Sequence, residues 1–307
     1  MTDGMPCMIS HLREIIIEGV LLNHKFSILL IPLLTLALGA CAGVPATIKA
    51  LSDLGVPGLN TYKPTTEIEQ LADAAMLSGK ARQIFYAAQP EIDMDRVAFE
   101  QHCHAPVATT AVELGCYTSQ NRIYLLNISE PRLSDEMVVV AAHEMLHAAY
   151  AGLSRAEIEA LTPQLEAALS KNHSTELTQR LRDYRASEPL QRENELHSII
   201  GTEFAPLDPP LEQYYSQYFT RRSVVVSDEQ QFQQVFSGIQ DSMNSLHAQI
   251  EKMRRDMDTA QRQKRIPAYN ALVPKYNSLI KQYNQTVAQY NELSRSLIGE
   301  ESTQVAQ

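Results

Sequence analysis

Residues 138–153, VVVAAHEMLHAAYAGL, form an almost wholly apolar run that nevertheless contains two histidines and a glutamate. The run is long enough for a core helix, and Gly152 is typical of a helix end. His143 and His147 are four residues apart, so on a helix both imidazoles lie on one face, with Glu144 beside them. Leaving such groups buried and unpaired costs on the order of several kcal/mol, and a bound metal removes that cost. The run therefore predicts a helix that carries a metal site.

The segments around this helix predict the rest of an α+β, mostly helical domain. Residues 122–128, RIYLLNI, favour a strand, which we expect to form the sheet edge along which an extended peptide adds. Ser134 is predicted to cap the metal-site helix. We also expect a strand near Arg96–Phe99 and helices over 65–77, 79–88, 154–172 and 175–204.

A catalytic zinc ion needs a third protein ligand, because it takes three and keeps one position open. The chain lacks a third histidine shortly after His147, which is followed by AAYAGLSRAE. A carboxylate from a later helix is the other common solution, and residues 192–204, RENELHSIIGTEF, are rich in such groups. The candidate ligands in this stretch are Glu193, Glu195, His197 and Glu203.

The pattern of His143, Glu144 and His147 resembles the H-E-x-x-H signature of zinc metallopeptidases. Residues 194–198, NELHS, resemble the N-E-x-x-S stretch of thermolysin-like gluzincins, and this resemblance implies Glu195 as the third ligand. The chain departs from that family in a longer gap after the first motif, with an extra helix inside it. The family's aspartate after the serine is also missing, so its histidine-orienting role must fall elsewhere or be absent.

Two other residues, Glu203 and His197, therefore remain alternatives to Glu195. Over residues 65–220 the chain as a whole resembles uncharacterised bacterial extracytoplasmic zincins. The resemblance implies a zinc-dependent peptidase with a peptide or protein substrate, in which Glu144 takes a proton from the attacking water. The tyrosines of LEQYYSQYF, 211–219, are either oxyanion donors or helix-packing residues.

The N-terminal 41 residues predict membrane targeting rather than part of the fold. Residues 26–40 are apolar throughout, but they are shorter than the roughly 20 residues of a spanning helix. They end in LGAC, which resembles the lipobox of bacterial lipoproteins and implies lipidation of Cys41. An uncleaved anchor is the alternative, and residues 42–63 read as a tether. Either case predicts a membrane-attached protein outside the cytoplasm.

Two further cysteines, Cys103 and Cys116, are 13 residues apart. In an oxidising compartment such a pair predicts a disulfide that closes a small loop. The alternative is a metal site, since His102 and His104 flank Cys103 and would share one face of a strand.

Residues 223–307 predict an antiparallel coiled-coil hairpin. The first arm carries an apolar seam at spacings of four and three: Phe232, Phe236, Ile239, Met243, Leu246, Ile250, Met253 and Met257. The second arm repeats Tyr-Asn every seven residues from Tyr269 to Asn291, and QKRIP separates the two. Pro274 should kink the second arm or mark its true start. The hairpin is either a self-contained coiled coil or a docking arm, for a partner or for the enzyme domain of the same chain.

The chain of 307 residues thus divides into a targeting segment 1–41, a tether 42–63, a zincin-like domain 64–222 and the hairpin 223–307. The net charge of −10 gives no basic surface for nucleic acid. Two other functions stay open beside the peptidase. One is a zinc-stabilised, non-catalytic envelope protein that works through its hairpin, and the other is a zinc hydrolase of a different amide bond, such as one in the cell wall.

Overall fold

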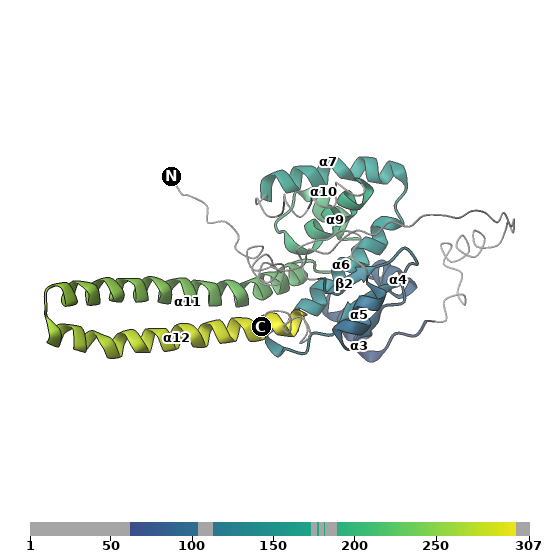
Figure 1. Cartoon of the computed structure of the whole chain (residues 1–307). Helices are drawn as coiled ribbons and strands as arrows, with labels where there is room; N and C mark the ends of the chain where they lie inside the picture. Colours follow the sequence, from purple (N-terminus) through teal and green to yellow (C-terminus); the bar gives the residue numbers. More distant parts are fainter. Residues whose placement is uncertain (1–61, 104–112, 173–176, 178–180, 182–188, 299–307) are drawn as a thin grey trace, which may run out of the picture.

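The computed structural model describes residues 62–103, 113–172, 177, 181 and 189–298, which are mostly helical with one small sheet (Figure 1). The helices are α3 Thr66–Ala74, α4 Gly79–Ala87, α5 Arg96–His102, α6 Glu136–Ala151, α7 Arg155–Asn172, α9 Pro189–Glu203, α10 Pro209–Tyr215, α11 Ser223–Arg262 and α12 Ile266–Ile298. The strands are β1 Glu91–Asp93, β2 Gly115–Tyr117 and β3 Ile123–Leu126, and a 3-10 turn, η1 Pro131–Leu133, precedes α6. The predicted targeting segment and nearly all of the tether lie outside the described residues. Within the described part, no helix combines the length and apolar character needed to cross a bilayer.

The sheet has the order β1-β3-β2, with β1 parallel and β2 antiparallel to β3. Ile92 pairs with Leu125 on one side, and Cys116 pairs with Tyr124 on the other. The strand predicted at 122–128 is therefore the central one, and its prediction as the free edge was wrong. The edge on the α6 side is β2, a strand of three residues that the sequence pattern did not indicate.

The two faces of β3 pack against different layers. Ile123 and Leu125 join the core formed with α3, α4, α6 and α9, whereas Leu126 joins a second cluster at the base of α11 and α12. This split follows from the alternation of side chains along a strand. The sheet is thus covered by α6 on one face and by α5 on the other, where the base of the hairpin joins the same apolar cluster.

Helices α6 and α9 approach one another closely at Gly201. A Cβ atom built on Gly201 would lie 2.4 Å from Leu146 Cδ1 and 2.8 Å from Tyr215 Cε1, far inside normal contact. Leu146 and Tyr215 are themselves fully buried, so neither has space to move away. The absence of a side chain at this position therefore sets how near α9 can come to α6.

We expect Gly201→Ala to destabilise the protein by about 1–3 kcal/mol, the usual cost of overpacking a close-packed core. In a chain of this size that lowers the melting temperature by roughly 2–4 °C per kcal/mol. Gly238→Ala in α11 is the matched control, because a Cβ there meets nothing within 4 Å. It should stabilise the helix slightly. Equal melting temperatures for the two variants would contradict this account.

Two local predictions were wrong. Residues 96–99 belong to helix α5, not to a strand, because the Asp95 side chain caps that helix by accepting from Ala98 N at 2.8 Å. Ser134 does not cap α6, since its hydroxyl donates to Pro131 O at 3.0 Å and Asp135 takes the cap position. By contrast, the helix expected within 65–77 is present as α3, which Thr65 caps by accepting from Ile68 N at 3.3 Å.

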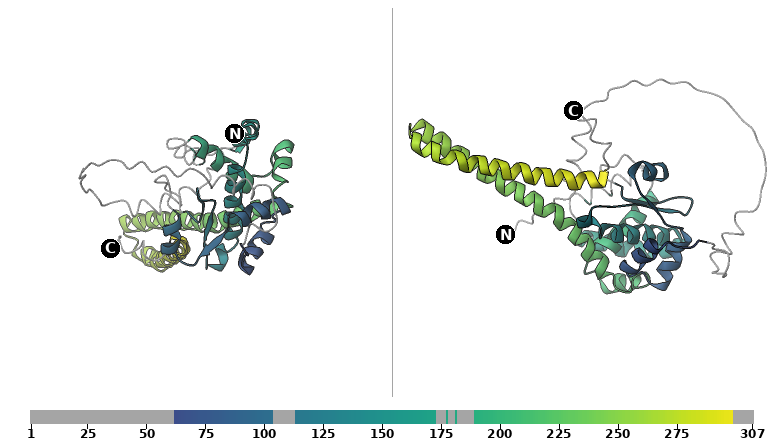
Figure 2. Two further views of the ribbon diagram at one scale, coloured as in Figure 1. Left: turned by 90° about the vertical axis from the view of Figure 1, so that its right-hand side faces the viewer. Right: turned by 90° about the horizontal axis from the view of Figure 1, so that it is seen from below.

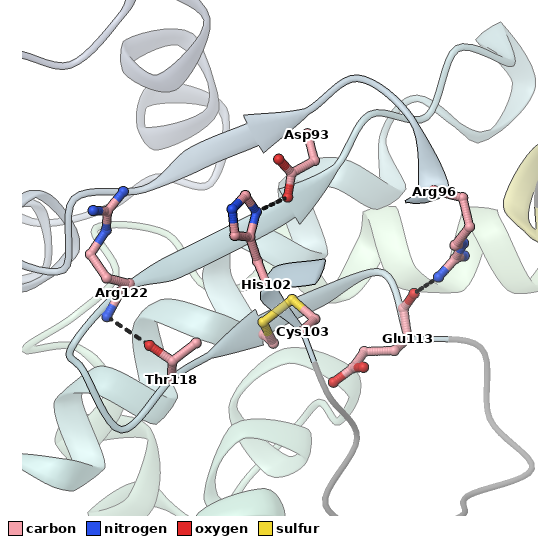
Figure 3. The surroundings of a disulfide bond; sticks show 8 residues. Asp93, Arg96, His102, Cys103, Glu113, Thr118 and Arg122 are labelled. Atoms are coloured by element: carbon pink, nitrogen blue, oxygen red, sulfur yellow. Dashed lines mark hydrogen bonds and ion pairs between the residues drawn. A yellow bond between two sulfur atoms is a disulfide. The ribbon is translucent and has the colours of Figure 1, made fainter. Parts of the chain in front are cut away.

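A disulfide joins Cys103, at the end of α5, to Cys116 in β2 (Figure 3). His102 does not sit on a strand: its Nδ1 lies 3.1 Å from Asp93 Oδ2, and its ring stacks on Tyr124 at a centroid distance of 4.1 Å. His104, the other histidine of the alternative metal site, lies outside the described residues. The edge strand β2 is thus bonded covalently to α5.

Helices α11 and α12 form the predicted antiparallel hairpin, which projects from the rest of the protein as a long arm (Figures 1 and 2). The turn falls at residues 263–265, where the sequence pattern breaks, and Lys264 adopts a positive φ of 52°. Every residue of the predicted seam on α11 is buried or half-buried. Pro274 lies inside α12 and does not mark its start.

Candidate metal centre

Helix α6 presents His143, Glu144 and His147 on a face that the core leaves partly open. The two imidazole rings lie 4.7 Å apart between centroids, at 73° to one another. Their side chains retain 17% and 15% of their exposure, whereas Met145 and Leu146 are fully buried. The apolar residues of the helix therefore fix it in the core, while both histidines share one side of it and stay partly exposed.

Helix α9 brings Glu195 to this histidine pair. Glu195 Oε2 lies 3.4 Å from His147 Nε2 and 3.8 Å from His143 Nε2. Zinc in catalytic sites takes ligand sets of this kind, with two imidazole nitrogens and one carboxylate oxygen. Here the imidazoles come from α6 and the carboxylate from α9. The structure thus gathers the three residues that the sequence motifs selected as ligands.

Asn194 orients one of the histidines. Its Oδ1 lies 3.0 Å from His147 Nδ1, so it accepts the proton of that nitrogen and leaves Nε2 free towards Glu195. Such outer contacts set the tautomer and the ring orientation of metal-binding histidines. Asn194 therefore supplies an orienting contact to His147 that the sequence left unassigned. Its position directly before Glu195 in the sequence could have identified it.

The two alternative ligands do not reach the pair. His197 is two residues beyond Glu195, on the opposite side of α9, fully buried and with Nε2 2.9 Å from Tyr214 Oη. Burial, followed by the nearby His147 and His143, lowers the pKa of His197 to about 3, so it stays neutral. Glu203 lies eight residues further along α9, which is about 12 Å along the helix axis.

The three tyrosines considered as oxyanion donors also face the His197 side of α9. Tyr215 Oη donates to His197 O at 2.7 Å, and Tyr214 Oη lies between His197 and Tyr218. Tyr215 and Tyr218 are almost completely buried. The geometry favours the helix-packing interpretation for all three.

Glu144 is buried between α6 and the edge strand β2. The backbone N–H of Tyr117 donates to its carboxylate, and its Oε2 is buried without a hydrogen-bond partner among the described residues. A Cβ on Gly115 would come within 2.9 Å of Glu144 Cγ, so a residue with a side chain does not fit at this strand position. Burial raises the pKa of Glu144, which favours its acting as a proton carrier.

A metal ion could in principle be shared by His143, Glu144 and His147 alone, since one ligand atom from each lies within 4.8 Å of the others. We prefer Glu195 as the third ligand, because its Oε2 approaches both Nε2 atoms directly. Glu144 instead keeps its carboxylate against the Tyr117 amide. This assignment leaves Glu144 beside the metal position, where a bound water would lie.

The electrostatics of the metal-free chain favour an ion pair at the site. Burial alone would raise the pKa of Glu195, but hydrogen bonds and charges from His143 and His147 lower it well below its usual value. Burial opposes protonation of His147, yet Glu195 and Glu144 raise its pKa to about 9. A metal ion would take the place of that proton, so metal binding should release it.

Glu113 adds a carboxylate that the sequence analysis did not identify. It lies two residues before Gly115, and its backbone carbonyl accepts from Arg96 Nη1 at 2.7 Å (Figure 3). Burial raises the pKa of Glu113 to about 7, helped by the negative charges of Glu144 and Glu195 and opposed by Arg96. No motif marks Glu113, because its environment depends on residues far away in the chain.

This raised pKa predicts a pH dependence of stability in the metal-free protein. The folded state holds a proton on Glu113 that the unfolded state releases near pH 4.5, so the contribution is complete below pH 4.5 and is lost as pH rises through about 7. Between these values stability should fall by up to about 1.4 kcal/mol per pH unit relative to Glu113→Gln. Denaturant unfolding of both proteins across this range, in chelator, measures the difference. A constant difference would refute the assignment.

The structure thus brings together His143, Glu144, His147 and Glu195, and it pairs Cys103 with Cys116. Cys41, the predicted lipidation site, lies outside the described residues. Comparison with protein-family models, with curated proteins and with solved structures finds no match to this chain.

Proposed function

We propose that this protein is a zinc-dependent peptidase with a zincin-like domain. The observation that carries the proposal is the convergence of Glu195, from α9, on both imidazoles of α6. A buried carboxylate, Glu144, lies beside them, as a general base requires. A purely structural metal site has no need of such a group, which speaks against a non-catalytic zinc protein.

The residues of the chain divide the work of hydrolysis among them. His143, His147 and Glu195 would hold zinc, which when bound supplies a Lewis acid and lowers the pKa of a water molecule towards neutrality. Glu144 takes a proton from the attacking water and passes it to the leaving amine. Asn194 keeps His147 in the required tautomer throughout.

The edge strand β2 is the proposed binding site for an extended peptide. Among the described residues it pairs with β3 on one side only, and at Gly115 it lies directly against Glu144. Addition of a substrate strand along such an edge would place a peptide bond next to the catalytic group. The proposed location is outside the cytoplasm, attached to the membrane, and the Cys103–Cys116 disulfide is consistent with an oxidising compartment.

The test is metal content and chelator-sensitive cleavage. The purified protein should hold one zinc ion per chain, and it should cleave members of a peptide mixture analysed by mass spectrometry. A chelator should abolish cleavage, and added zinc should restore it. Bound zinc with no cleavage of any peptide would instead support the zinc-stabilised binding protein, and cleavage of cell-wall fragments alone would support the amide hydrolase.

A further inference from the structure

The outer part of the hairpin carries a charge opposite to that of the rest of the chain. Residues 251–281, which span the end of α11, the turn and the start of α12, contain eight lysines and arginines and three acidic residues. The net charge of this segment is +5. Because the whole chain carries −10, the residues outside the segment together carry −15. A separation of this size along one molecule gives the end of the arm an electrostatic field of its own.

All eight cations are exposed, and they do not all lie on one face of the arm. Lys252 and Arg255 are three residues apart and share one side of α11, whereas Arg254 lies on another side, because successive residues of an α-helix are turned by about 100°. Arg262, Lys264 and Arg265 gather at the turn itself. Such an arrangement suits a broad anionic surface met by the end of the arm better than a partner held along one side.

An exposed apolar residue stands at the same end. Ile266, the first residue of α12, retains 57% of its exposure, and within the described residues the other large hydrophobic side chains exposed in this way, Met94 and Val97, lie on the body. Apolar side chains next to clustered cations are the combination that binds the interface of anionic membranes. The arm is long enough for this contact, since the 40 residues of α11 span about 60 Å.

The charge pattern and the exposed apex point to a contact between the tip of the hairpin, residues 262–266, and an anionic phospholipid surface. Arg262, Lys264 and Arg265 bind the headgroups, and Ile266 enters the interface between them. The contact does not depend on the proposed peptidase activity. It would make the hairpin a docking arm with a membrane partner, rather than a self-contained coiled coil.

The test uses the absence of tryptophan from the chain, which makes Ile266→Trp a unique fluorescent reporter at the tip. The full-length variant is added to vesicles of phosphatidylcholine alone or with phosphatidylglycerol, in each case with and without brominated lipid. We expect a blue shift and quenching by bromine in anionic vesicles only, both weakened at 1 M salt, where the screening length falls to about 3 Å. Met94→Trp, a position 73% exposed on the body, is the matched control and should show neither effect.

A second pair of variants tests the cations. Reversing Arg262, Lys264 and Arg265 to glutamate in the Ile266→Trp background should reduce quenching about tenfold or more. Reversing three exposed cations of the body, Arg155, Lys171 and Arg221, changes the net charge equally and should leave quenching intact. Equal quenching in neutral and anionic vesicles, or in both charge variants, overturns the inference. So does the same spectral shift with soluble polyglutamate, or with rising protein concentration in the absence of lipid.

Discussion

Replacing Glu144 with glutamine is expected to abolish most peptide cleavage while zinc stays bound. Glutamine keeps the shape of the side chain, which matters because Gly115 lies against it, but an amide cannot accept the proton of the attacking water. Loss of a general base costs typically about 10²- to 10⁴-fold in rate. The measurement is kcat/KM on a peptide found by digestion of a mixture, with zinc content determined on the same sample.

Glu136→Gln provides the matched control for this experiment. Glu136 is a buried glutamate at the start of the same helix, two turns before the metal position. The same substitution there should leave kcat/KM nearly unchanged, so an effect confined to Glu144 reports chemistry rather than helix stability. If Glu144→Gln retained cleavage within about threefold, the assignment of Glu144 as general base would fall.

Glu195→Ala is expected to lose zinc, and this variant decides the third ligand. Removing even an outer contact of a metal ligand costs about 10- to 100-fold in affinity, so removing a ligand should cost more than that. The wild-type protein should gain about 2.7 kcal/mol of stability at a free zinc concentration of 100 times its Kd, and Glu195→Ala should gain almost none. Competition with a fluorescent zinc chelator and thermal melting measure both effects.

Two further variants sharpen this result. Asn194→Ala should weaken zinc binding by about 10- to 100-fold through loss of its contact to His147, without abolishing it. Glu203→Ala is the control, since Glu203 lies about 12 Å further along α9 and should bind zinc like the wild type. Loss of zinc in Glu203→Ala with retention in Glu195→Ala would contradict the geometry of the site.

The features that the sequence predicted well are those set by local spacing. His143 and His147 share a helix face because they are four residues apart, and Glu195 was reached through a five-residue resemblance. The hairpin followed from heptads that run for many turns, so a few exceptions such as Pro274 did not obscure it.

The features that it missed depend on pairings between distant segments. Strands β1 and β2 have three residues each, too few for a period to be read, and the order β1-β3-β2 exists only once they pair. The raised pKa of Glu113 and the need for glycine at position 115 both arise because that edge strand lies against Glu144. The Arg96–Phe99 segment has strand-like residues, yet it forms a helix because the Asp95 side chain caps its first turn.

One guanidinium links the arm to the strand that lies against Glu144. Arg96 donates to the carbonyl of Leu297, near the end of α12, and to the carbonyl of Glu113, just before β2. The disulfide then fastens the other end of α5 to the same strand. A force applied at the tip of the arm, about 50 Å away along the 33 residues of α12, would therefore pull on the edge strand and so on the amide that holds Glu144.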